Sequence, residues 1–125
     1  MAEKRVVVTG LGVVAPNGVG LPAFTAALRD GTSGIAFHQH LADASFGCQV
    51  GGIPSGIAEL QDRYLTDEEL FAMNPNMIYA AIAGIDAWTD AGLERKPAEA
   101  DEVDWDTGAI VGTGIGGIDT VAEKL

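Results

Sequence analysis

Short blocks of apolar residues alternate with polar and glycine-rich stretches along the chain. Residues 5–8 are a β-branched run followed by glycines at positions 10 and 12, which is typical of a strand buried on both faces. Residues 109–111, Ala-Ile-Val, predict a second buried strand. Helical patterns lie between these two strands, and this alternation favours the α/β class.

Capping and turn residues mark the ends of further elements. The predicted elements are a turn at 16–18, helices at 21–30, 59–64 and 67–71, and a final helix beginning at 119. Thr66 and Glu69 have the spacing of a capping box ahead of the helix at 67–71. The weakly patterned stretch 37–57 is expected to be loop, apart from a short strand at 46–50.

The most strongly marked helix is predicted at 75–91. Asn74 is its N-cap, Pro75 occupies its first position and Gly92 ends it. Apolar or small residues occupy nearly its whole circumference, which indicates burial on more than one side.

Charge and cysteine content narrow the class of protein. The chain has 125 residues, with 7 basic and 18 acidic side chains and a formal net charge of −11. The scattered basic residues form no patch, so nucleic acids and anionic membranes are excluded as partners. The single cysteine, Cys48, fits a reducing compartment. With no signal-peptide pattern and no run of about 18 apolar residues, the sequence predicts a cytoplasmic protein.

A glycine-rich turn follows the second predicted strand. Gly112, Gly114 and Gly117 have the G-x-G-x-x-G spacing of dinucleotide-binding turns. The confirming acidic residue about 20 positions later has no counterpart in the sequence. Such glycines, like Gly10 and Gly12, are also expected where backbone passes close to a helix. A small nucleotide-binding module therefore stays open as an alternative function.

The other residues with chemical potential favour structural roles. His38 and His40 are two residues apart without a nearby set of further ligands, so no metal site is predicted. Cys48 has no basic neighbour and is expected to be a small buried apolar residue. The aspartates between 101 and 106 lack the glutamate of a calcium loop and predict a solvated acidic linker. No catalytic residue is assigned within the chain.

Four motifs, in order along nearly the whole chain, resemble the β-ketoacyl synthases. They are Arg5 to Gly18, Gly31-Thr32-Ser33-Gly34-Ile35, Met73-Asn74-Pro75 with the helix to Asp90-Ala91-Gly92-Leu93, and Gly108 to Gly117. The resemblance implies a thiolase-like α/β fold of αβαβα layers. Residues 1–125 would then be the N-terminal portion of the synthase N-terminal domain, which is incomplete in this chain.

The resemblance also implies an activity and partners. A condensing acyltransferase of this type joins an acyl thioester to a malonyl-carrier-protein unit by decarboxylating Claisen condensation, in fatty-acid or polyketide synthesis. Its cysteine and two histidines would lie beyond Leu125 and do not match Cys48, His38 or His40. No cofactor is implied, because phosphopantetheine on an acyl carrier protein holds the substrates. The implied partners are this carrier, the remainder of the synthase chain and a second ketosynthase subunit, in a homodimer or heterodimer.

The same resemblance points to one substrate-binding loop. Ile115 matches a residue that lines the acyl pocket, and Gly114 and Gly116 would let the loop approach the acyl chain or a partner subunit. Two departures are evident, because residues 66–72 are acidic where many members carry basic residues for the carrier, and Asn74 replaces aspartate. These departures leave open a non-catalytic subunit of the chain-length-factor type, or a secondary-metabolism synthase with altered docking.

Two structural expectations follow. Strands 5–8 and 109–111 should pair as neighbours in one sheet, with helix 75–91 packed across it. The isolated chain should fold poorly, because half-formed sheets expose apolar faces and unpaired edges.

Overall fold

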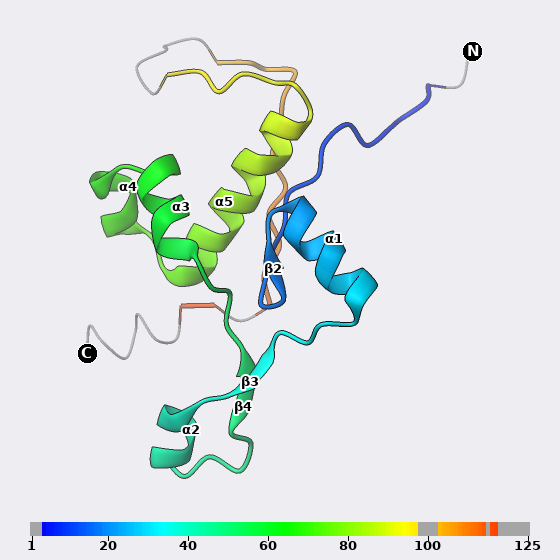
Figure 1. Ribbon diagram of the computed structural model, residues 1–125. Helices are drawn as coiled ribbons and strands as arrows, with labels where there is room; N and C mark the ends of the chain where they lie inside the picture. Colours follow the sequence, from blue (N-terminus) through cyan, green and yellow to red (C-terminus); the bar gives the residue numbers. More distant parts are fainter. Residues whose placement is uncertain (1–3, 98–102, 115, 118–125) are drawn as a thin grey trace.

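The computed structural model describes residues 4–97, 103–114 and 116–117, which form a mixed α/β arrangement of five helices and two short antiparallel strand pairs in that part of the chain (Figure 1). The elements in order are β1 (Val14–Ala15), β2 (Gly18–Val19), α1 (Leu21–Asp30), β3 (Ile35–Phe37), α2 (Gln39–Asp43), β4 (Val50–Gly52), α3 (Ile57–Tyr64), α4 (Asp67–Ala72) and α5 (Pro75–Asp90). None of the described helices has the length and apolar character needed to cross a bilayer.

Both described sheets are antiparallel pairs. β1 pairs with β2 around the predicted turn at 16–18, with Val14 opposite Val19. β3 pairs with β4, with Phe37 opposite Val50. Figure 1 shows the β3–β4 pair and α2 projecting away from the helices. The predicted strand at 46–50 was wrong in position, because the pairing begins only at Val50.

The two long-range strands expected from sequence do not form in the described part of the chain. Residues 5–8 and 109–111 have no strand assignment, so the expectation that they pair as neighbours was wrong for this structure. Their side chains are exposed, with Val6 at 95% and Ile110 at 102% relative accessibility. A β-branched run becomes a strand only when a neighbouring edge satisfies its backbone groups, and the described residues supply no such edge here.

The helices agree well with the sequence. α1 has proline in its first turn and ends at Gly31, whose φ of 66° is left-handed. α4 begins with the predicted capping box, in which Thr66 and Glu69 each bond the other's backbone N–H. α5 is capped by the Asn74 carboxamide oxygen, which accepts from Met77 N–H at 3.1 Å. The predicted final helix from 119 lies outside the described residues.

α5 is the element around which the fold is arranged. The extended segment at 10–12 lies so close to it that a Cβ on Gly12 would meet backbone atoms of Ala83 and Ala87. Between the two glycines, the N–H of Leu11 donates to Oδ2 of Asp90 at 2.9 Å. These contacts confirm that Gly10 and Gly12 serve close segment-to-helix packing.

Burial around α5 is less complete than the sequence pattern predicts. Ile82 is fully buried, and α3 packs against α5, but Met77 remains 48% exposed and Trp88 38% exposed. Among the described hydrophobic residues only Ala27, Leu65 and Ile82 are buried. The core is therefore small.

Candidate functional site

Residues 111–113 and 116 of the glycine-rich segment lie against the first half of α5 and line an open cavity of about 490 Å³ with it. Its walls come from two stretches of chain about 35 residues apart in sequence. The lining residues are Asn74, Asn76, Met77, Tyr79 and Ala80 from the helix and its cap, and Val111, Gly112, Thr113 and Gly116 from the loop. Methionine, alanine and valine give the cavity an apolar wall suited to a hydrocarbon group.

Two asparagines on the start of α5 meet the two glycines that end the loop. A Cβ on Gly116 would lie 2.6 Å from Nδ2 of Asn76, which is closer than carbon and nitrogen atoms pack. A Cβ on Gly117 would lie 3.0 Å from Nδ2 of Asn74, and Gly117 also has a left-handed φ of 77°. Gly117 therefore needs glycine for its backbone conformation, whereas a Cβ at Gly116 would require only that the Asn76 amide move.

The substrate-binding residues predicted from sequence divide into three cases. Gly116 lies beside Asn76 of α5 and lines the cavity, and its substrate-binding role stays a prediction. Gly114 has open space where a Cβ would stand. Ile115 lies outside the described residues. The dinucleotide reading loses support, because residues 109–111 form no strand ahead of the glycines.

His38 and Cys48 have structural surroundings. Nε2 of His38 donates to the carbonyl oxygen of Gly51 at 3.1 Å, across the β3–β4 pair, and its ring lies 5.5 Å from that of His40. Cys48 is exposed, so the expectation of a buried apolar residue was wrong, since it lies in the loop before β4. Its thiol is directed at the carbonyl oxygen of Val50 at 3.6 Å. His38 therefore has the structural surroundings expected of it, and among the described residues neither His38 nor Cys48 forms a catalytic pair.

The acidic linker is solvated, as predicted, over its described residues. Oδ2 of Asp104 accepts from the Thr107 hydroxyl at 2.7 Å, and Oδ1 accepts from Asp106 N–H at 3.0 Å. These two hydrogen bonds, the Thr107 one foremost, lower the pKa of Asp104. Within the described residues, no group of three or more His, Cys, Asp or Glu could hold a metal ion.

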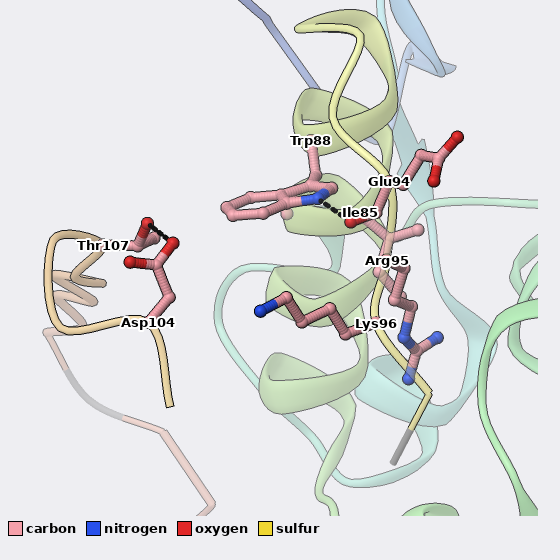
Figure 2. A pocket seen from close by; sticks show the side chains of 8 residues that line it. Ile85, Trp88, Glu94, Arg95, Lys96, Asp104 and Thr107 are labelled. Atoms are coloured by element: carbon pink, nitrogen blue, oxygen red, sulfur yellow. Dashed lines mark hydrogen bonds between the residues drawn. The ribbon is translucent and has the colours of Figure 1, made fainter. Parts of the chain in front are cut away.

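A second cavity, of about 440 Å³, lies at the other half of α5 (Figure 2). Gly84, Ile85 and Trp88 form its helical wall, and the segment at 94–96 and the turn at 104–107 form the rest. Trp88 Nε1 donates to the carbonyl oxygen of Glu94 at 3.0 Å. Because this indole and the Asp104 carboxylate already bond within the chain, the cavity is better explained as a packing gap than as a binding site.

A hydrogen-bond network links the helices next to the second cavity, which Arg95 also lines. The Tyr64 hydroxyl donates to Oδ1 of Asp86 at 2.9 Å, which raises the pKa of Tyr64. Arg95 donates to the Tyr64 carbonyl oxygen at 2.7 Å and pairs with Glu69 at 3.3 Å. The Thr66 backbone N–H and hydroxyl, in that order, lower the pKa of Glu69. These hydrogen bonds link α3, α4 and α5 to one another.

Sequence reasoning missed Asn76, Met77 and Tyr79 as cavity residues. They lie on a helix predicted correctly, but no local pattern tells which turn of that helix faces a loop about 40 residues later. The glycine spacing at 112–117 was the only available signal, since glycines mark a close approach without naming its partner.

Comparison with known proteins identifies the class to which this arrangement belongs. The profile described as "Beta-ketoacyl synthase, N-terminal domain" matches residues 3–124. The chain therefore belongs to the β-ketoacyl synthase family.

Individual relatives agree with this assignment. The chain is 31% identical to 3-oxoacyl-(acyl-carrier-protein) synthase 2 of Vibrio cholerae, over 97% of this chain and 28% of that protein. It is 36% identical to synthase 1 of the same type from Escherichia coli, over 90% of this chain and 26% of the relative. It is also 36% identical to the tetracenomycin polyketide synthase ketoacyl synthase beta subunit of Streptomyces glaucescens, over 94% of this chain and 27% of that protein. The chain thus spans between a quarter and a third of the length of these relatives.

Proposed function

We propose that this chain is part of a condensing enzyme that joins an acyl thioester to a malonyl-carrier-protein unit with loss of carbon dioxide, in fatty-acid or polyketide synthesis. The family match over residues 3–124 is the observation that carries the proposal. Relatives with fatty-acid-type and polyketide-type names both match, so either kind of acyl chain fits.

The surface of the chain supports the proposal that further synthase protein covers it. Among the described residues, Val6 is 95% exposed, Val8 80% and Ile110 102%. Strands of the layered thiolase-like fold would cover such residues.

The catalytic cysteine and histidines of the proposed reaction come from outside this chain. Cys48 and His38 are engaged with backbone carbonyl oxygens of the β3–β4 pair and its approach. The role proposed for this part of the chain is to shape the acyl site, through Gly114 and Gly116 and, as the family resemblance implies, Ile115. No cofactor is required, because the carrier's phosphopantetheine delivers both substrates.

The partners in this proposal are an acyl carrier protein, the remainder of the synthase and a second ketosynthase subunit. The first turn of α4 carries Asp67, Glu68 and Glu69, which would repel an acidic carrier. The carrier is therefore expected to dock on a surface other than α4. The cytoplasmic location stays a prediction.

The test uses the full protein that contains this chain, incubated with acyl-carrier protein and malonyl-carrier protein. Mass spectrometry should find the 3-oxoacyl product, lengthened by two carbons, and an acyl group on one cysteine outside residues 1–125. Acylation of Cys48, or loss of condensing activity in a Cys48→Ala variant, would contradict the proposal. A protein that never becomes acylated but enables a partner subunit would instead be of the chain-length-factor type.

The 125-residue chain by itself gives a second test. With so small a core and so much exposed surface, it should unfold over a broad range without a cooperative transition. A sharp melt of a monomer, together with saturable dinucleotide binding, would favour the free-standing nucleotide-binding module.

A further inference from the structure

The short helix α4 exposes one aromatic ring among carboxylates. Phe71 is 90% exposed, although phenylalanine is among the residues most often buried. Asp67 and Glu68 precede it by four and three positions in the same helix, so the three side chains share one side of α4, which we call the α4 face. Both acidic residues are exposed as well. Figure 1 shows α4 next to α3, on the opposite side of the helices from α1.

The α4 face is held in place by contacts made on the rest of the helix. Glu69, the third acidic residue, accepts from Thr66 in the capping box and pairs with Arg95 at 3.3 Å. Asp67 and Glu68 make no side-chain hydrogen bond or ion pair with the residues that the structure describes. Their charges are therefore available on a helix that is already formed, which lowers the entropy cost of binding a partner.

The α4 face differs from the surfaces that further synthase protein is proposed to cover. Residues 6–8 and 109–111 are continuous apolar runs, suited to burial between strands. Permanent burial of the α4 face would instead strip water from two carboxylates, which is unfavourable unless each gains a cation. An aromatic anchor beside polar groups that stay partly hydrated is typical of the interfaces of separable partners.

We propose that the α4 face is a docking site for a separate protein whose own surface carries lysine or arginine around an apolar pocket that takes the Phe71 ring. Charge complementarity selects this occupant, because Asp67 and Glu68 attract basic groups and repel acidic ones. The formal net charge of −11 adds a field of the same sign, so a second copy of this chain is repelled too. The proposal does not depend on the condensing activity, since the α4 face is no part of the proposed acyl site.

The experiment measures binding of a cationic probe to the full protein that contains this chain. The probe is an amphipathic helical peptide of leucine and lysine, about 16 residues long, and the control peptide has glutamate in place of lysine. Phe71→Ala should raise the dissociation constant of the lysine peptide about tenfold, because it removes the anchor. Asp67→Asn and Glu68→Gln should each raise it about threefold at low salt. The glutamate peptide should not bind.

Two matched variants separate docking from general attraction to an acidic protein. Asp62→Asn removes an exposed carboxylate from α3, and Phe46→Ala removes a ring that is 59% exposed in the loop before β4. Both should leave the dissociation constant unchanged. Because Phe71 is so exposed, Phe71→Ala should also leave the thermal midpoint of unfolding unchanged. Equal effects of Asp62→Asn and Glu68→Gln, or no effect of Phe71→Ala, would overturn the proposal.

Hydroxyl-radical footprinting tests whether the α4 face is open in the full protein. Phe71 should be oxidised nearly as fast as in the unfolded chain, and the lysine peptide should slow that oxidation. Protection of Phe71 without the peptide would mean that the rest of the synthase or a second copy covers it, which would overturn the proposal. Weaker binding of acyl carrier protein to Phe71→Ala would make α4 the carrier's dock and would also overturn it. A protein that condenses no acyl group, yet shows the peptide's protection of Phe71, would uphold this proposal and contradict the proposed function.

Discussion

Substitution of Gly12 by alanine is expected to be among the most damaging single-methyl additions in the described part of the chain. The new Cβ would stand against the carbonyl oxygen of Ala83 and 2.7 Å from the backbone nitrogen of Ala87. Both atoms belong to the backbone of α5, so no side chain can rotate away. This situation differs from Gly116, where the obstructing atom is the end of a side chain.

The magnitude follows from the distances. The 2.7 Å approach is about 0.7 Å shorter than the 3.4 Å at which ordinary contact begins, so the segment must move off the helix. That movement also lengthens the Leu11–Asp90 hydrogen bond. Overpacking of this kind costs about 1–3 kcal/mol, and loss of the hydrogen bond adds about 1 kcal/mol, giving about 3 kcal/mol in all.

Gly84 on the same helix is the matched control. It has nothing within 4 Å of its Cβ position and lies inside α5, so Gly84→Ala should stabilise the protein by about 0.5–1 kcal/mol. Urea unfolding of the full protein that contains this chain would compare the two midpoints at equal slope. If Gly12→Ala unfolds within about 0.5 kcal/mol of the unmodified protein, the close approach of the segment to α5 is refuted.

Other perturbations test the core and the supporting network in the same assay. Ile82→Ala should destabilise by about 2–5 kcal/mol, because the side chain is fully buried, and a cost below about 1 kcal/mol would contradict that burial. Thr66→Ala should cost about 1 kcal/mol through loss of the α4 cap. Since the folded pKa of Glu69 is lowered, the stability it provides is present above its ordinary pKa of 4.5 and is lost as pH falls through the folded value. Thr66→Ala should abolish that part of an acid titration, and an unchanged titration would refute the link. Tyr64→Phe should cost about 1 kcal/mol. The raised pKa of Tyr64 means that its contribution is complete below pH 10 and is lost as pH rises through the folded value, so the phenylalanine variant should lack this alkaline loss.

The helices could be predicted from the sequence because their signals are local. Asn74, Pro75 and Gly92 mark the ends of α5 within one turn of each end, and Thr66 with Glu69 marks the start of α4. α2 was missed for the same reason, since its N-cap His38 makes no side-chain cap and leaves no signature.

The strands and the cavity depend on distant residues. A valine run has strand propensity, but only a neighbouring edge makes it a strand, and none is present for residues 5–8 among the described residues. The contact between Asn76 and Gly116 joins residues 40 positions apart, so neither residue alone indicates it. Gly10 and Gly12 correctly predicted that their segment passes close to a helix, but only the structure identifies that helix as α5.

The exposed valine run has a consequence for synthesis on the ribosome. Val6, Val7 and Val8 leave the ribosome before Ile110 and Val111, which follow more than a hundred residues later. At about 5–20 residues per second, that interval lasts about 5–20 seconds. Throughout it the nascent chain displays an unpaired β-branched segment, which is the kind of surface that holdase chaperones bind and that aggregates without them. Production of this protein should therefore depend on chaperone supply.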